Sequence, residues 1–349
     1  MTQIVGWDLG GANIKSACVN GGRVDSVTQT PCPAMQDYRK FDEAFGRALA
    51  GLASPAARHA VTMTGELSDV FQDRREGVRY LSQMVEKALP NVAIYAGRAG
   101  FVSPQDVTDH VADIASANWH ASASLAAQIC GDGLLIDIGT TTADLVPFRD
   151  DCVASSGYSD AERLHAGELV YTGVVRTPVM AIAQSATLHG RKQRIAAERF
   201  ATMADVYRLT GELPEDADPY PTPDRRGNSF EESAARLARM LGMDASDATM
   251  PDWITLANDF AGRQLTLLKD AASQVLTEAA MPSGAPILGA GCGRFLAAHI
   301  ARRLGRSYSD FADLIDAEPG AREMAARCAP AVAVAILAGD FSKRTLRDI

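Results

Sequence analysis

Short apolar runs alternate with amphipathic stretches in the first third of the chain. QIVGWD, IKSACV, HAVTMTG and NVAIYAG predict strands that end at turns rich in small or polar residues. Between them, Phe41, Phe45 and Leu49 recur at helical spacing within 37–52, and RYLSQMVEKALP predicts a second helix that stops at a proline. Strands that alternate with helices predict an α/β architecture with partly parallel sheets.

The pattern restarts at Leu134, after which one region differs in character. Within 190–250, we interpret the basic stretch RKQRIAAERF as the solvated face of a helix, with an entry patch for an anionic substrate as the alternative. A proline-rich loop and the amphipathic stretch FEESAARLARMLGM follow it, so we expect a helical insertion. A long helix is expected over about 252–280, and AVAVAILAG near the end predicts a buried helix.

Composition and charge indicate a globular protein of two domains and argue against several classes of binding site. The 349 residues suit two modest domains, and 47% hydrophobic with 22% charged residues is typical of a globular chain. A net charge of −9 argues against general nucleic-acid binding, and six scattered cysteines without a C-x-x-C pair argue against a zinc site or a disulfide framework. With neither a signal peptide nor a transmembrane run visible, we expect a cytoplasmic protein that does not bind membranes.

Two similar hairpins carry the chemistry. IVGWDLGGANIKSACV and LLIDIGTTTADLV each join an apolar run ending in aspartate, a glycine, small residues and a second apolar run. Such turns leave backbone N–H groups free to cradle phosphate oxygens, while the aspartate reaches Mg²⁺. As metal ligands we expect Asp8 and Asp137, and as phosphate-binding residues Gly10, Gly11, Asn13, Lys15, Gly139, Thr140, Thr141 and Thr142.

A third glycine turn strengthens this interpretation. Either hairpin alone is most often a plain turn, in which aspartate and glycine serve turn geometry. ILGAGCGRF has the strand, glycine turn and helix that would pack against a nucleobase or another flat group, with Gly289 and Gly291 lining it. Together the three turns predict one site that clamps a polyphosphate and its metal ion.

This arrangement resembles the sugar kinase, Hsp70 and actin superfamily. The resemblance covers residues 4–19, 134–148, 287–295 and 331–339. It implies two actin-like, ribonuclease H-like domains with mixed sheets flanked by helices. The expected domains are 1–133 with 331–349, and 134–330 with the helical insertion at about 190–250.

Several stretches resemble one branch of that superfamily, the hydantoinase/oxoprolinase-like family linked to tetrahydromethanopterin-dependent one-carbon metabolism. They include GWDLGGANIKSA, TMTGELSDVF, SANWHASA and HAGELVYTGVVRTPV. The resemblance implies a transferase of methanofuran biosynthesis. Such an enzyme joins an aminomethylfuran-methyl diphosphate to the phenol oxygen of a tyramine- or tyrosine-type acceptor, forming an aryl ether and releasing diphosphate.

The implied reaction needs a general base and an anion-binding cation. Glu66 in the TMTGELSDVF loop and Asp144 are the catalytic candidates, while Asp69 is at least as well explained by a helix cap. Arg176 is the candidate for a substrate carboxylate or phosphate, with a surface arginine as the simpler alternative. His120, beside Trp119, is better explained by a buried structural pair than by stacking on a ligand.

Two other functions use the same residues. An ATP-dependent small-molecule kinase or ATPase would place adenosine at the third glycine turn, and a non-enzymatic nucleotide switch would couple nucleotide to assembly. We expect Mg²⁺ as cofactor, with ATP under these alternatives. The expected partners are a small-molecule diphosphate and a phenolic amine, not nucleic acid or membrane, with a homodimer as the oligomeric state to test.

Overall fold

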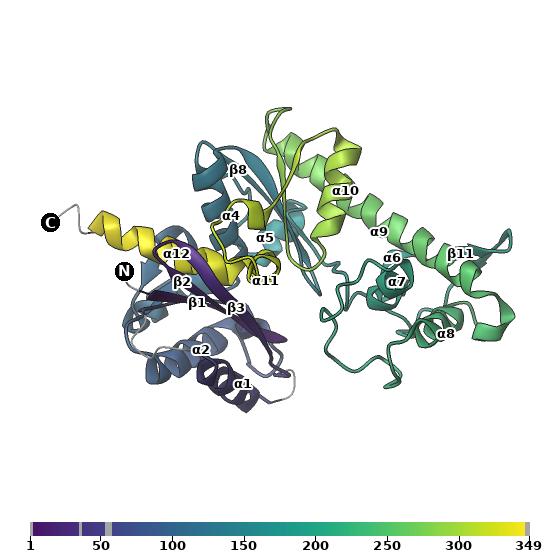
Figure 1. Cartoon of the computed structure of the whole chain (residues 1–349), viewed down its shortest axis with the longest axis horizontal. Helices are drawn as coiled ribbons and strands as arrows, with labels where there is room; N and C mark the ends of the chain where they lie inside the picture. The colour runs from purple at the N-terminus through teal and green to yellow at the C-terminus, as the bar shows by residue number, and fades with distance from the viewer. Residues whose placement is uncertain (1–2, 35–36, 53–57, 346–349) are drawn as a thin grey trace. The chain divides into compact units, whose positions relative to one another are not determined.

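The computed structural model describes residues 3–34, 37–52 and 58–345, and the chain forms two units (Figure 1). The first unit comprises 1–135, 146–165 and 309–349, and the second 136–145 and 166–308. Among the described residues, no helix is long and apolar enough to cross a membrane. The domain limits expected from the sequence stay a prediction, and residues 346–349 of the first domain lie outside the described residues.

A six-stranded mixed sheet organises the first unit. Its order is β3-β2-β1-β4-β5-β6, in which β2 and β3 run antiparallel as a meander from β1, while β4 and β5 run parallel to it. The strands are β1 (Gln3–Leu9), β2 (Asn13–Asn20), β3 (Arg23–Pro31), β4 (Arg58–Met63), β5 (Val92–Tyr95) and β6 (Phe101–Val102).

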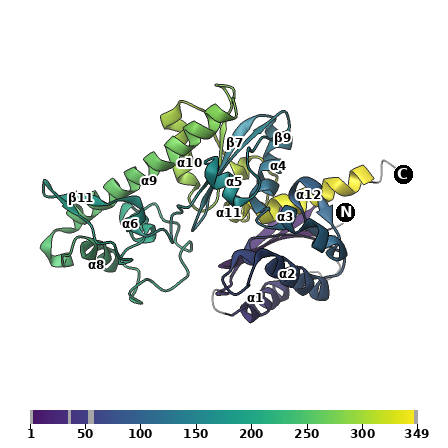
Figure 2. The ribbon, with the colours of Figure 1, turned by 180° about the vertical axis from the view of Figure 1, so that it is seen from behind.

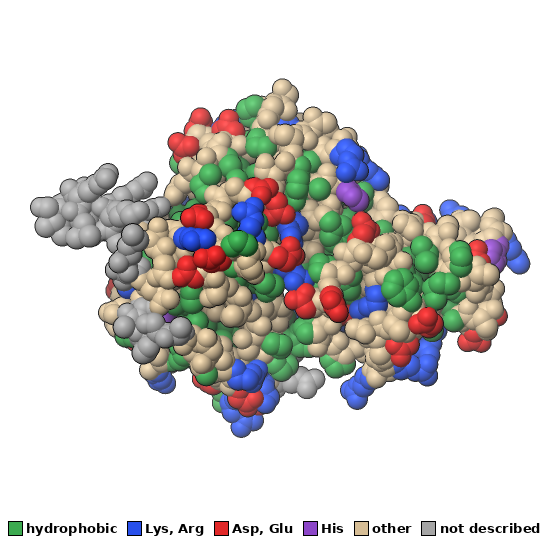
Figure 3. Space-filling model, in the orientation of Figure 1, with side chains coloured by type: hydrophobic (Ala, Val, Ile, Leu, Met, Phe, Trp, Pro, Cys, Tyr) green, Lys and Arg blue, Asp and Glu red, His purple; other side chains and the backbone are tan. Residues whose placement is uncertain are grey.

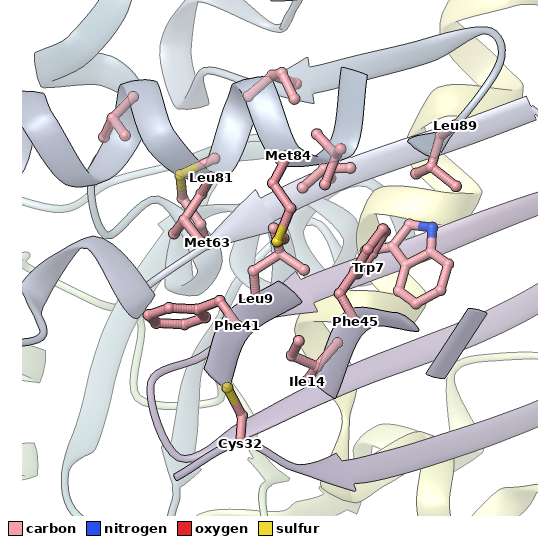
Figure 4. Close-up of a cluster of buried hydrophobic side chains, with 14 of the residues drawn as sticks. Trp7, Leu9, Ile14, Cys32, Phe41, Phe45, Met63, Leu81, Met84 and Leu89 are labelled. Carbon is pink, nitrogen blue, oxygen red and sulfur yellow. The ribbon is translucent and has the colours of Figure 1, made fainter. Parts of the chain in front are cut away.

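Helices cover both faces of this sheet. In Figures 1 and 2, α1 and α2 lie on one face and α12 on the other. Side chains alternate along β1, so Trp7 and Leu9 enter the apolar cluster under α1 and α2 (Figure 4), while Gly6 and Asp8 belong to the opposite face. The helices of this unit are α1 (Arg39–Ala50), α2 (Arg74–Ala88), α3 (Val111–Ile114), α4 (Asn118–Cys130), α5 (Asp160–His165), α11 (Arg322–Arg327) and α12 (Ala329–Thr345).

Gly6 sets how closely α12 packs on the sheet. A Cβ at this position would lie 1.9 Å from the Ala331 carbonyl oxygen and 2.9 Å from the Ala335 Cβ. We therefore expect Gly6→Ala to lower the free energy of unfolding by about 2–3 kcal/mol, because the helix must move away. Urea unfolding measures this, with Gly46→Ala in α1 as control. Nothing lies within 4 Å of a Cβ at Gly46, so a gain of about 0.5–1 kcal/mol is expected there. Equal effects of the two changes would contradict the packing argument.

The second sheet repeats the order of the first. Its main path is β10-β8-β7-β13-β14, so the first strand of its hairpin, β7, again lies between its hairpin partner, β8, and a strand from later in the chain, β13. Because β7 and β8 enclose the second acidic turn as β1 and β2 enclose the first, the two hairpins hold equivalent places. The strands are β7 (Gly133–Ile138), β8 (Ala143–Arg149), β9 (Cys152–Val153), β10 (Leu169–Val170), β13 (Ile287–Ala290) and β14 (Tyr308–Asp310).

The insertion of the second unit packs along its longest helix, α9 (Met250–Glu278), with α10 (Arg294–Leu304) following β13 (Figure 1). The other elements here are α6 (Val179–Ile182), β11 (Ser185–Leu188), β12 (Arg191–Arg194), α7 (Met203–Thr210) and α8 (Phe230–Met240). The expected fold class, α/β with mixed sheets and a helical insertion, is confirmed. On the face shown in Figure 3, acidic and basic side chains are interspersed.

The helix expected at RKQRIAAERF is wrong. Arg191, Lys192 and Arg194 lie in β12, which pairs antiparallel with β11. The turn between these strands is His189-Gly190, and both residues have positive φ, 48° and 73°. Two consecutive residues of that conformation fit the tight turn of a β-hairpin, which outweighs the helical character of the flanking residues.

Candidate functional site

The first acidic turn, residues 10–12 between β1 and β2, is called loop one. It is closed by a hydrogen bond from Gly10 N–H to the Asn13 carbonyl oxygen at 3.0 Å. Asp8, at the end of β1, is 2% exposed and lies 3.1 Å from Lys15 Nζ through its Oδ2. Lys15 therefore compensates the buried carboxylate and is not simply a solvent-facing strand residue.

Three oxygen atoms around loop one are buried without a hydrogen-bond partner among the described residues. They are Asp8 Oδ1, Asn13 Oδ1 and Thr62 Oγ1. Asp8 is in register with both Lys15 and Thr62, and Asn13 is two residues from Lys15, so these side chains share one face of the sheet. Carboxylate, amide and hydroxyl oxygens are ligands that Mg²⁺ accepts, so this group fits the expected cation.

The glycines of loop one pack closely against neighbouring atoms. A Cβ at Gly11 would lie 2.5 Å from Ser68 Oγ, and one at Gly10 would lie 2.8 Å from the Asn13 carbonyl oxygen. Thr64 N–H also donates to the Leu9 carbonyl oxygen at 3.0 Å. The segment that follows β4 is thus held against loop one, and it contains Glu66.

Glu66 is a buried carboxylic acid in the short 3₁₀ helix Gly65–Leu67. It is 1% exposed, and its Oε1 accepts hydrogen bonds from Ser116 N–H at 2.8 Å and from Ser116 Oγ at 3.3 Å. Its Oε2 is buried without a hydrogen-bond partner in the described part of the chain. Burial raises the pKa of Glu66 to about 7, a value suited to proton transfer near neutral pH.

The second acidic turn, residues 139–142 between β7 and β8, is called loop two. It is closed as loop one is, by a hydrogen bond from Gly139 N–H to the Thr142 carbonyl oxygen at 2.9 Å. In both turns the donor is the glycine two residues after the aspartate. This equivalence supports the repeated hairpin that the sequence suggested. Thr140 and Thr141 are half-buried.

The segment after β10 runs along loop two. Val174 N–H donates to the Gly139 carbonyl oxygen at 3.1 Å, and Arg176 N–H donates to the Thr140 carbonyl oxygen at 2.8 Å. Gln264 of α9 supports this segment from behind through Thr172 Oγ1 at 2.6 Å. The structure therefore places the backbone of Arg176 beside loop two, and the phosphate-binding role of its side chain stays a prediction.

The third glycine turn packs on the end of β7. Gly293 N–H donates to the Ile138 carbonyl oxygen at 2.8 Å. Gly291 has a φ of 81°, and a Cβ there would lie 2.4 Å from Asp137 Oδ1, so glycine is required. Gly289 lies inside β13, where a Cβ would lie 2.5 Å from the Tyr308 hydroxyl oxygen. Internal packing is thus a sufficient reason for glycine at 289, and its contact with a ligand stays a prediction.

Of the remaining candidate residues, one keeps a possible catalytic role and the others do not gain one from the structure. Asp144 is half-buried in β8 opposite Leu169, and its catalytic role stays a prediction. His120 is buried, with Nδ1 2.8 Å from the Tyr95 hydroxyl, and burial lowers its pKa to about 4, which fits a structural pair. Asp69 is exposed, and Asp73 instead caps α2 by accepting from Glu76 N–H at 2.8 Å.

Loop one and Glu66 lie in the first unit, whereas loop two, Arg176 and the third glycine turn lie in the second. That both sets act on one ligand stays a prediction. Within the described ranges, no group of three or more His, Cys, Asp or Glu residues is arranged to hold a metal ion. A cation site built from the described residues would therefore include amide, hydroxyl, water or substrate oxygens in addition to carboxylates.

Sequence reasoning missed Thr62 and Ser116. A polar residue within the apolar strand HAVTMTG was the available signal for Thr62. Nothing local marked Ser116, because its partner Glu66 is distant in sequence. Both residues are recognised only from burial and contacts in the folded chain.

The model of the hydantoinase/oxoprolinase family matches residues 58–311. A protein of Methanocaldococcus jannaschii is 30% identical over 77% of this chain and 80% of its own length. One from Methanococcus vannielii is 28% identical over 36% of this chain and 57% of its own length. Both are named (4-{4-[2-(gamma-L-glutamylamino)ethyl]phenoxymethyl}furan-2-yl)methanamine synthase. The nucleotide-free structure of acetone carboxylase shares the fold, with a TM-score of 0.54 at 10% identity over 87% of this chain and 67% of that one.

Proposed function

The chain belongs to the hydantoinase/oxoprolinase family, and we propose that it is a transferase that forms an aryl ether and releases diphosphate. The similarity to the Methanocaldococcus synthase carries this proposal, because that protein's name describes a phenoxymethyl-furan product. The substrates would be an aminomethylfuran-methyl diphosphate and a phenolic amine. The same name favours a γ-glutamylated tyramine as the acceptor.

The chemistry suits a site built to bind diphosphate. The bond between the furfuryl carbon and the diphosphate oxygen breaks, and the phenol oxygen forms a bond to the same carbon. The furan oxygen stabilises positive charge on that carbon, so the enzyme mainly neutralises the leaving group and orients the phenol. Mg²⁺, when bound, would supply part of that neutralisation.

Each group of residues has a role in this proposal. Lys15, the backbone N–H groups of the two loops and Arg176 would bind the diphosphate, and Asp8, with Asp137, would hold the cation. Glu66 would take the phenol proton through Oε2, because its pKa of about 7 lets it be ionised at neutral pH while remaining a useful base. Asp144 is the second candidate for the base.

Diphosphate binding tests the proposal directly. We expect inorganic diphosphate to bind in Mg²⁺ buffer by calorimetry, and Asp8→Asn and Asp137→Asn each to weaken it at least about tenfold, since each removes a charged ligand. Asp259→Asn, an exposed change on α9, is the control and should bind as the unaltered protein does. Product formation from the furan diphosphate and γ-glutamyltyramine then tests the reaction.

Two outcomes would redirect the proposal. Micromolar ATP binding without diphosphate binding, about −8 kcal/mol, would favour a kinase or ATPase. Unchanged diphosphate binding in both aspartate variants would remove the acidic hairpins from the binding site, whatever the reaction proves to be.

A further inference from the structure

Ser116 makes an unusual pair of contacts for a residue that precedes a helix. It is 5% exposed and lies two residues before α4, with a φ of 55°. Both of its donors, the backbone N–H at 2.8 Å and the hydroxyl at 3.3 Å, converge on one oxygen, Glu66 Oε1. A positive φ is uncommon for a residue with a Cβ, and glycine would adopt it more easily. The serine thus adds a hydroxyl at a position where the backbone favours glycine.

The two contacts divide the carboxyl group of Glu66 into a bound and an unbound oxygen. Oε1 has two donors, whereas Oε2 is buried without a hydrogen-bond partner among residues that the structure describes. From another side, α2 fixes the glutamate backbone, because a Cβ at Gly77 would lie 2.6 Å from Glu66 Cα. The side chain is therefore anchored at its backbone and at one oxygen, whereas no hydrogen bond within the described residues holds the other oxygen.

We propose that Ser116 is the positioning residue of Glu66: it orients the carboxyl group through Oε1, so that Oε2 receives the proton of the phenolic substrate. The proposal rests on the function proposed above for Glu66. It also accounts for the stretch SANWHASA, which contains Ser116 and to which no catalytic role has otherwise been given. Ser116 itself touches no reacting atom.

A negative charge near Glu66 acts against these donors. Asp160 of α5 raises the pKa of Glu66 by its negative charge, in addition to the larger effect of burial, and Arg74 of α2 lies 2.9 Å from Asp160. The backbone N–H of Glu66 and both hydrogen bonds from Ser116 favour the ionised carboxylate and lower the pKa. Without the hydroxyl, Glu66 should remain protonated to higher pH.

Two variants separate the hydroxyl from the backbone. Ser116→Gly removes the hydroxyl, keeps the N–H donor and tolerates the positive φ, whereas Ser116→Ala removes the hydroxyl and keeps the strain. Ser122→Ala is the matched control, because Ser122 is a fully buried serine of the adjacent helix α4. For each variant we would measure kcat/KM from pH 5 to 9. We would also measure the free energy of unfolding over the same pH range and compare it with that of the double variant that also carries Glu66→Gln.

We expect the acidic limb of the kcat/KM profile of Ser116→Gly to move upward by about half to one pH unit. Activity at pH 6 would then fall about three- to tenfold and would recover by pH 9. A purely structural role would lower activity equally at all pH values. Ser116→Ala should show the same shift with an additional pH-independent loss, and Ser122→Ala should show no shift.

A Ser116→Gly profile of unchanged shape would overturn the proposal, as would an unchanged pH dependence of stability. The failure of the proposed function is distinguishable from this result. If Glu66→Gln keeps full activity, Glu66 is not the base. The stability measurement, which needs no substrate, then still reports whether the Ser116 hydroxyl controls the protonation of Glu66.

Discussion

Glu66→Gln is expected to stabilise the protein at alkaline pH while removing most of its activity. Burial raises the pKa of Glu66 from 4.5 to about 7 in the folded chain. Because the pKa of this carboxyl group is higher in the folded chain than in the unfolded chain, its full contribution to the free energy of unfolding is present below about pH 4.5. That contribution is lost as the pH rises to and through 7. The expected loss by pH 8 is about 3 kcal/mol, which Glu66→Gln would avoid because it carries no ionisable proton.

Urea unfolding at pH 5 and pH 8 measures this prediction. Glu66→Gln should be clearly more stable than the unaltered protein at pH 8, with a much smaller difference at pH 5. Its kcat should fall by about 10²- to 10⁴-fold, the usual contribution of a general base. Glu86→Gln, an exposed carboxylate of the same unit, is the control and should show neither effect. A Glu66→Gln protein that is less stable than the unaltered one at both pH values would show that the carboxylate is satisfied in the folded state.

Removal of Arg236 is expected to cause the largest loss of stability in the second unit. Its side chain is completely buried in α8, with Nη2 2.7 Å from Asp205 and Nη1 3.2 Å from Asp224. Nη1 also donates to the Gly227 carbonyl oxygen at 3.0 Å, which ties the proline-rich loop to the helices. Arg236→Ala leaves Asp205 buried with Arg208, at 3.3 Å, as its remaining ion-pair partner among the described residues and with Thr202 N–H, at 3.0 Å, as a backbone donor. We therefore expect a loss of about 3–5 kcal/mol.

Arg239 provides the matched control on the same helix. Its side chain is 38% exposed and its Nη1 lies 3.7 Å from Asp224, so Arg239→Ala should cost less than about 1 kcal/mol. Urea unfolding gives the two free energies, and hydrogen exchange of α7 and α8 shows whether the loss is local to the insertion. Equal losses in the two variants would mean that the buried pair adds no more than an exposed one.

The elements that sequence predicts well are those whose signals are local. The strands around loop one and the long helix α9 follow from apolar runs and helical periodicity within a few neighbouring residues. The hairpin at β11 and β12 was missed because two positive φ values at His189 and Gly190 determine it, and histidine does not signal that conformation as asparagine would.

The candidate site divides in the same way. Asp8, Asp137 and the glycines beside them are recognisable because an acidic turn repeated in one chain is a pattern of neighbouring residues. The orphaned oxygen of Thr62 and the two donors of Ser116 have no such pattern, because they depend on strands and loops that meet only in the folded unit.

By itself, the sequence determined the α/β class, the repeated hairpins and the resemblance to a family. Periodicity, turn chemistry and motif spacing depend only on residues that are close together in the sequence. The tertiary structure alone decided which carboxylate is buried, which oxygen of Glu66 has no donor among the described residues, and which arginine is hydrogen-bonded to a loop. Burial and charge are set by residues distant in the chain, and these two quantities control the pKa of a base and the stability of an ion pair.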